Sequence, residues 1–207
     1  MKSLWIWIVI GLILRLVVMG TTIHPDIRGH NLAAYLISQK GHLFTFYDYL
    51  RQQPRDDRLV QIYGDGLFIY PPLAYWTHAP FMAVLGPLYP WGTFERLMLD
   101  MGSLARFSDG LPQLLILLKI PYLVADALGL WLVLKVVEKK HQLLTGIMWL
   151  FNPVTIYASY MVGQFDIYIA ILILASLATL KSRSWLSAVL LGLAAGFKPF
   201  PLVLAPF

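Results

Sequence analysis

Cysteine is absent from this 207-residue sequence, and charged residues are scarce. Without cysteine the chain can form neither a disulfide bond nor a thiolate metal site. Charged residues make up 13% of the chain, against about 25% in ordinary soluble domains. Internal repeats and low-complexity tracts are absent as well. A water-facing surface like that of a soluble domain is therefore excluded.

What the sequence has instead is hydrophobic residues, which make up 58% of the chain and gather in long runs. A helix needs about 20 mainly apolar residues to cross the hydrocarbon core of a bilayer. We predict an all-α fold, a polytopic transmembrane helical bundle that forms a single membrane-embedded domain over residues 1–207. The predicted spans are 4–20, 72–88, 114–137, 143–161, 167–180 and 185–207, with an external loop at 21–69.

The first run also has features of a signal peptide, because Lys2 supplies a short positive region before it. Arg15 interrupts the run, however, and no small-residue cleavage site follows Gly20. We therefore expect this span to be retained.

Lysine and arginine gather in two short loops, at 135–140 and 181–183. The positive-inside rule predicts that both loops are cytoplasmic, which puts Gly163 and Lys198 on the extracytoplasmic side. Strict alternation of spans conflicts with this order, so one segment is not a simple span. Either the proline-rich residues 72–88 form a re-entrant hairpin, or part of the external loop enters the membrane.

Two segments, 31–40 and 91–107, have the amphipathic spacing of helices that lie along a membrane surface. The formal net charge of +5 is modest, and no basic patch is interleaved with aromatic residues in a soluble segment. We therefore expect membrane lipids as partners of the basic loops, and no nucleic acid.

A carboxylate follows the first span, in the segment His24-Pro25-Asp26-Ile27-Arg28-Gly29-His30. At this level it has access to water and to lipid headgroups, which a general base for a hydroxyl needs. Alternatively, Asp26 begins and caps the next helix; the residues alone leave both interpretations open. We interpret His24 and His30 as ordinary interfacial residues, because no further ligand accompanies them at metal spacing.

Five more polar or charged residues lie at or near membrane depth. Lys119 and Asp126 share a helix face, and they either pair with each other or contact a substrate. Gln164 and Asp166 lie at a predicted helix N-terminus, where Asp166 either caps the helix or the free N–H groups hold an anionic headgroup. Lys198 follows a helix C-terminus, and it either offsets the helix dipole or forms a fixed cation for a phosphate.

In their order along the chain these motifs resemble the N-terminal half of the GT-C superfamily of membrane glycosyltransferases. The nearest groups are the GPI-anchor mannosyltransferase-related proteins and the dolichyl-phosphate-glucose glucosyltransferases. The resemblance covers nearly the whole chain, and because members are usually longer we expect residues 1–207 to be the N-terminal part of a GT-C fold. The motifs that carry it are Pro-Asp-Ile-Arg-Gly-His at 25–30, Tyr-Pro-Pro-Leu at 70–73, the stretch from Lys119 to Asp126, Asn152-Pro153 with Gly-Gln-Phe-Asp at 163–166, and Gly-Phe-Lys-Pro at 196–199.

The resemblance implies an enzyme that moves mannose or glucose from a polyprenyl-phosphate donor to an acceptor hydroxyl on the extracytoplasmic face. It implies inversion at the sugar, no metal and no other cofactor. Asp26 would be the catalytic base, and Lys198, ahead of Arg28, the cation that stabilises the leaving phosphate. Where many relatives have a second acidic residue this chain has Ile27, and Asp48 or Asp65 are the alternatives. The implied substrate-binding residues are Arg28, Lys119, Asp126, Gln164, Asp166 and Lys198.

The implied partners are the lipid-linked sugar donor and a lipid-linked or protein glycan acceptor. The resemblance implies a multi-pass integral membrane protein, in the plasma membrane of a prokaryote or the endoplasmic reticulum of a eukaryote. The competing interpretations are a polytopic transporter or flippase of lipid-linked glycans and a non-catalytic membrane subunit. A transporter would more often show two symmetric halves, and the sequence shows no such symmetry.

Overall fold

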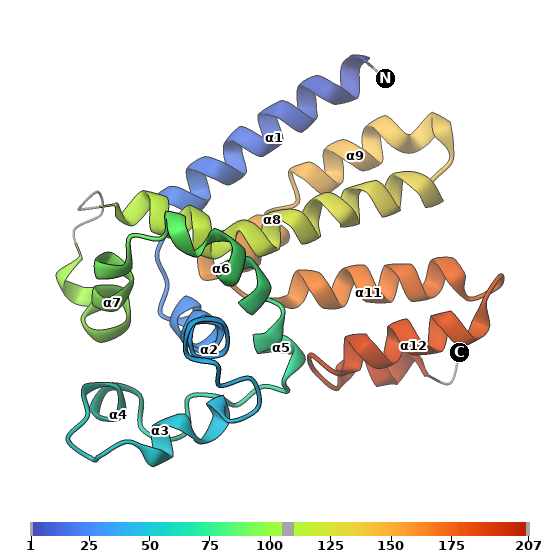
Figure 1. Cartoon of the computed structure of the whole chain (residues 1–207). Coiled ribbons are helices and arrows are strands. Elements are labelled where there is room, and N and C mark those ends of the chain that lie inside the picture. The colour runs from blue at the N-terminus through green and yellow to red at the C-terminus, as the bar shows by residue number, and fades with distance from the viewer. Residues whose placement is uncertain (1, 105–109, 206–207) are drawn as a thin grey trace.

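The computed structural model describes residues 2–104 and 110–205, and helices account for most of them (Figure 1). No β-strand occurs in these two stretches, so the all-α prediction is confirmed for the described chain. The longer apolar helices run side by side, whereas the short helices between residues 26 and 99 gather at one end of them.

Two helices, α1 (Lys2–Thr21) and α8 (Leu111–Val136), are long and apolar enough to cross a membrane. Their apolar stretches have mean hydropathies of 2.2 and 1.8. Large side chains of α1 face outward, with Trp5 65% and Ile13 56% exposed. Soluble proteins rarely leave a continuous apolar stripe of this kind in water, so α1 is suited to contact lipid.

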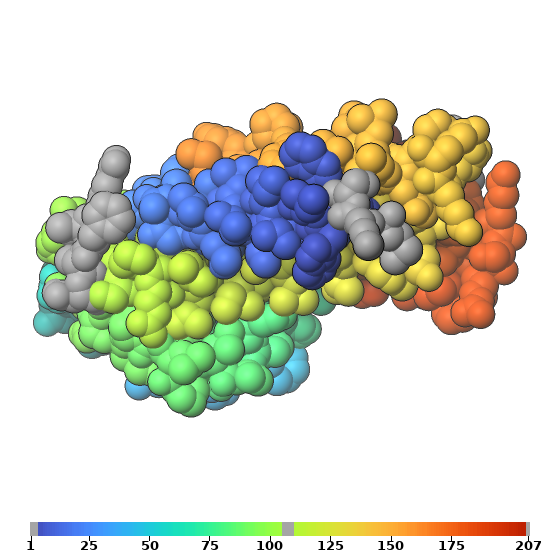
Figure 2. Space-filling model, turned by 90° about the horizontal axis from the view of Figure 1, so that it is seen from above, coloured from blue at the N-terminus to red at the C-terminus, as the bar shows by residue number. Residues whose placement is uncertain are grey.

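The predicted span 143–161 is a broken helix. The Asn152 side chain accepts hydrogen bonds from the two backbone N–H groups that follow Pro153, at 2.9 and 3.4 Å, and so caps a new helical start. The pieces are α9 (Gln142–Leu150), preceded by the 3₁₀ turn η4 (Lys139–His141), then α10 (Pro153–Thr155) and the π-helix η5 (Ile156–Val162). Seen from above, α1 lies between α8 and η5 (Figure 2).

The helices α11 (Asp166–Thr179) and α12 (Ser184–Ala195) form an antiparallel pair, followed by the 3₁₀ helix η6 (Phe200–Leu204). The Ser176 hydroxyl donates to the backbone oxygen of Ser187 at 2.9 Å and ties the pair together. Both helices are apolar but shorter than the 18 residues that a candidate span requires. Two helices of spanning length, rather than the predicted six, are therefore found in the described chain.

The predicted span 72–88 is not a single helix. It consists of α5 (Leu73–Trp76), α6 (Ala79–Leu85) and the 3₁₀ turn η2 (Gly86–Leu88), each with proline at or next to its start. Proline lacks an N–H group and ends the helix before it, which divides the run. Both α5 and α6 pack against α2.

The predicted external loop is largely helical. Its helix α2 (Asp26–Lys40) begins five residues before the predicted segment 31–40 and buries Leu32 and Leu36, as the amphipathic pattern predicts. The second predicted surface helix is α7 (Trp91–Leu99), which buries Phe94, Leu97 and Met98; residues 105–107 of its predicted range lie outside the described residues. The remaining short elements are η1 (Phe46–Asp48), α3 (Tyr49–Gln52), α4 (Arg58–Tyr63) and η3 (Met101–Ser103).

Candidate functional site

Two residues that are 138 positions apart in sequence meet at the start of α2. The Gln164 amide Nε2 donates to the Asp26 carboxylate at 2.5 Å. His24 Nδ1 lies 3.3 Å from the other carboxylate oxygen, and the Asp26 side chain is 42% exposed. Asp26 is the first residue of α2 but makes no capping hydrogen bond with its side chain. Asp26 therefore begins the helix, as the alternative interpretation predicted, but its side chain does not cap the helix and remains open to solvent.

The turn before α11 brings Gln164 to this position. Gly163 adopts φ 83°, in the left-handed region, and a Cβ there would meet Ile27 Cγ1 of α2 at 3.3 Å. The Tyr122 hydroxyl of α8 donates to the Gly163 carbonyl at 2.6 Å. Because glycine adopts this conformation without steric cost, the chain can turn tightly against α2 and direct the next side chain to Asp26.

A second acidic residue, Asp166, pairs with Lys198. The lysine Nζ lies 2.5 Å from the carboxylate, 4.9 Å from the centre of the Phe165 ring and 5.6 Å from that of Tyr70. Asp166 begins α11 but makes no capping hydrogen bond with its side chain, so the capping interpretation is wrong here too. Its carboxylate instead neutralises the cation that the sequence singled out.

A cavity of about 310 Å³ lies beside Asp26 and is lined by both α2 and the turn at Gln164. Arg28 is part of its wall, with the guanidinium 5.0 Å from the centre of the Tyr63 ring. No ion pair of Arg28 occurs in the described part of the chain. Neither Asp48 nor Asp65 lines the cavity, so neither of these alternative acids shares it with Asp26.

His30 is buried near both charged groups, and its prediction as an ordinary interfacial residue is wrong. It is 3% exposed; its ring stacks on that of Tyr70 (5.8 Å between centres) and meets that of Phe165 edge-on (4.9 Å). Burial lowers the pKa of His30 to about 4, although Asp26 and Asp166 oppose the shift. The imidazole is therefore neutral near pH 7.

Lys119 and Asp126 lie elsewhere, and they do not pair with each other. The Lys119 Nζ donates to the backbone oxygens of Met19 and Thr22, at 3.1 and 2.7 Å, and to the Thr22 hydroxyl at 3.1 Å. Both charged residues are buried between helices, 0% and 3% exposed, and neither lines the Asp26 cavity. This placement favours a structural role over substrate binding.

Asp126 finds its partners on three other elements. Arg15 Nε of α1 lies 2.5 Å from its carboxylate, and the Trp149 Nε1 of α9 and the Tyr160 hydroxyl of η5 each donate to it at 2.7 Å. In the sequence Arg15 interrupts an apolar run, and no local pattern names its partner. A buried arginine needs an anionic partner, so an arginine inside an apolar run predicts a carboxylate on a neighbouring helix.

The chemistry of the Asp26 site follows from its accessibility and its neighbours. An exposed carboxylate that accepts one amide hydrogen bond can still accept a proton from a hydroxyl. The adjacent guanidinium can stabilise an anion. No group of three or more histidine and acidic side chains suited to a metal ion occurs among the described residues.

Comparisons with protein-family models, with curated proteins and with solved structures found no match to this chain. The site is therefore interpreted from its own geometry.

Proposed function

We propose that this protein is a membrane glycosyltransferase that moves a hexose, mannose or glucose, from a polyprenyl-phosphate donor to an acceptor hydroxyl. The observation that carries the proposal is the solvent-accessible Asp26 carboxylate, held by Gln164 at a cavity whose wall also contains Arg28. A base and a cation on one cavity are what transfer from a lipid phosphate requires. The motif order that resembles the GT-C superfamily supports the same reading.

In the proposed reaction Asp26 accepts the proton of the acceptor hydroxyl. The acceptor oxygen forms a bond to the anomeric carbon as the bond from that carbon to the phosphate oxygen breaks. The electron pair of the broken bond leaves with the polyprenyl phosphate. A single displacement of this kind inverts the anomeric centre, as in inverting glycosidases, where a carboxylate activates the nucleophile.

The leaving phosphate needs a cation, and the contacts favour Arg28 over Lys198. Lys198 is already neutralised by Asp166 at 2.5 Å. Arg28 interacts with the Tyr63 side chain and has no carboxylate partner in the described chain. A guanidinium that no carboxylate neutralises is well suited to hold a phosphate. Gln164 would orient the base rather than contact the phosphate.

The proposal includes a multi-pass arrangement in the membrane. It is supported by two helices of spanning length, by the shorter apolar pair α11 and α12, and by the exposed apolar side chains of α1. In this arrangement Asp26 works on the extracytoplasmic side.

The test is transfer of labelled hexose from a panel of polyprenyl-phosphate mannose and glucose donors, with membranes that contain the protein. We expect Asp26→Asn to reduce transfer by at least about a hundredfold, the usual size of a general-base effect, while donor binding is kept. Asp48→Asn is the matched control, because that aspartate is an exposed residue of the same loop outside the cavity. Transfer that survives Asp26→Asn would remove the base from this site. A lack of transfer from every donor would favour a flippase.

A further inference from the structure

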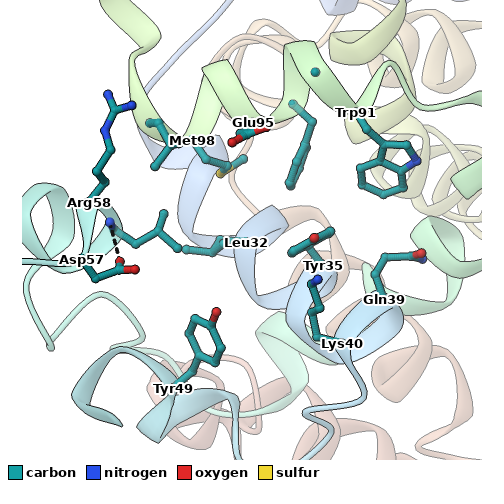
Figure 3. A pocket seen from close by; sticks show the side chains of 14 residues that line it. Leu32, Tyr35, Gln39, Lys40, Tyr49, Asp57, Arg58, Trp91, Glu95 and Met98 are labelled. Carbon is teal, nitrogen blue, oxygen red and sulfur yellow. Dashed lines mark hydrogen bonds between the residues drawn. The ribbon is translucent and has the colours of Figure 1, made fainter. Parts of the chain in front are cut away.

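A second and larger cleft lies between α2, α3, α4 and α7, with a volume of about 790 Å³ (Figure 3). It is distinct from the Asp26 cavity: the two are lined by different residues. None of the proposed catalytic or phosphate-binding groups faces it. Its lining combines aromatic rings with hydrogen-bonding side chains, and this combination identifies the kind of ligand it fits.

The aromatic wall is built by Tyr35 of α2 with Trp91 and Phe94 of α7. The Tyr35 ring centre lies 5.6 Å from that of Trp91 and 5.4 Å from that of Phe94. The Trp91 and Phe94 rings are 5.5 Å apart and nearly perpendicular. These contacts hold a rigid aromatic surface at the edge of the cleft, with Trp91 and Tyr35 only partly buried.

The polar wall carries groups that both donate and accept. Gln39 and Glu95 are exposed, and Figure 3 shows the Tyr49 hydroxyl directed into the cleft. The Asp57 carboxylate caps α4 by accepting the backbone N–H groups of Leu59 at 2.8 Å and of Val60 at 3.4 Å. It is fixed in place by these bonds.

The charges of the cleft cancel. Its lining has two cations, Lys40 and Arg58, and two carboxylates, Asp57 and Glu95. The Lys40 Nζ lies over the Tyr35 ring at 5.6 Å, and Arg58 extends away from the cleft in Figure 3. A phosphate or another anion would therefore face at least as many negative groups as positive ones. A purely apolar chain would leave buried polar groups without partners.

The cleft and the Asp26 cavity share a wall. Tyr63 lines the cavity, and its hydroxyl donates to the backbone oxygen of Met98, which lines the cleft. On α2, Arg28 of the cavity and Leu32 of the cleft are four residues apart, about 6 Å along the helix. A ligand in the cleft would thus lie about one turn of α2 from the residues that line the Asp26 cavity.

We propose that this cleft binds an uncharged saccharide, which is the glycan part of the acceptor. Sugar rings have an apolar C–H face that packs on aromatic rings and hydroxyl groups that pair with amide, carboxylate and phenol groups, and the cleft offers both surfaces side by side. The role as acceptor site rests on the proposed transferase function, whereas saccharide binding does not.

The test is direct binding of neutral manno- and gluco-oligosaccharides to the full chain in detergent, by saturation-transfer NMR and equilibrium dialysis. We expect binding that weakens about tenfold or more in Trp91→Leu, as is typical for an aromatic anchor of a binding site. Trp185→Leu is the matched control, because that tryptophan is 68% exposed on α12, away from the cleft. Tyr49→Phe removes one oxygen without altering the packing, and we expect it to weaken binding several-fold.

The outcomes separate this proposal from the proposed function. Saccharide binding that persists in Asp26→Asn supports the cleft, even where no donor gives transfer. A folded protein that binds no neutral saccharide overturns the proposal, and so does binding that neither Trp91→Leu nor Tyr49→Phe weakens. Hexose transfer with an unchanged acceptor KM in Trp91→Leu overturns the cleft and leaves the transferase intact. Capture of inorganic phosphate by the cleft, without neutral sugars, also contradicts it.

Discussion

Asp26 and Asp166 occupy the same position in two helices and nevertheless have different chemical character. Each is the first residue of its helix and neither caps it with its side chain. Asp166 faces an ammonium group at 2.5 Å, whereas Asp26 faces an uncharged amide at the same distance. A proton transferred to Asp166 would break an ion pair, while a proton transferred to Asp26 would not. The partners therefore make Asp26 the better base.

The buried His30 predicts a pH dependence of stability. Its pKa is lowered by burial to about 4, below the value of about 6.5 in an unfolded chain. The unfolded state therefore binds a proton first as the pH falls. The contribution to stability is complete above about pH 6.5 and is lost between about pH 6.5 and 4, by up to about 3 kcal/mol. We expect His30→Gln to lose less stability than the native protein across this range, measured by thermal unfolding at a series of pH values.

The control for this prediction is His141→Gln, because His141 is exposed in η4. Its curve should follow that of the native protein. The buried His78 is 1% exposed and is present in all three proteins, so only the difference between curves is interpreted. Identical pH profiles of the native protein and His30→Gln would contradict the prediction.

At the scale of elements, Asp126 fastens α8 to α1, α9 and η5. Its carboxylate is engaged by Arg15, Trp149 and Tyr160, and the Arg15 Nη1 also donates to the backbone oxygen of Leu150 at 2.7 Å. Removing one member of a buried pair leaves an uncompensated charge, which costs about 3–5 kcal/mol. We expect Asp126→Leu to destabilise the protein by that amount in denaturant unfolding in detergent.

A double variant makes this prediction specific to charge. Arg15→Leu with Asp126→Leu removes both ions and should recover part of the stability that Asp126→Leu loses. Glu138→Gln is the control, because its ion pair with Lys140 is about 70% exposed on both sides, and exposed pairs contribute about 0–1 kcal/mol. Equal losses for Asp126→Leu and Glu138→Gln would refute the role assigned to Asp126.

Local sequence signals predicted where several helices begin or break, but not their long-range partners. The start of α11 shortly after Gly163 and the break at Asn152 follow from glycine, proline and one capping residue, which act within a few positions. The meeting of Gln164 with Asp26 depends on how the turn before α11 lies against α2, and no local pattern encodes that. The prediction for residues 72–88 was wrong for a local reason. Their apolar composition suggested a span, although prolines divide the segment into short helices. The burial of His30 could not be predicted either, because the rings that cover it, Tyr70 and Phe165, are far away in sequence.

At the scale of the whole molecule, the apolar helices separate two polar ends. The short helices and the Asp26 cavity gather at one end, while the connections α8–α9 and α11–α12, with Lys139, Lys140 and Lys181, lie at the other (Figure 1). The 26 residues of α8 extend about 39 Å at 1.5 Å per residue, more than the hydrocarbon thickness of about 30 Å. The two polar ends are therefore far enough apart to lie on opposite sides of a bilayer.

This separation predicts the sidedness of the protein, and the absence of cysteine allows a direct measurement. We expect Lys139→Cys, at the lysine-rich end, to react with a membrane-impermeant maleimide only from the cytoplasmic side, because positive loops are retained there. Asp56→Cys, an exposed position next to Asp57 of the cleft, should react only from the opposite side. The native protein, which has no thiol, gives the background, and labelling after detergent solubilisation shows that both thiols are reactive. Labelling of both variants from the same side of intact membranes would mean that α8 does not cross the bilayer, and the proposed extracytoplasmic reaction would fail with it.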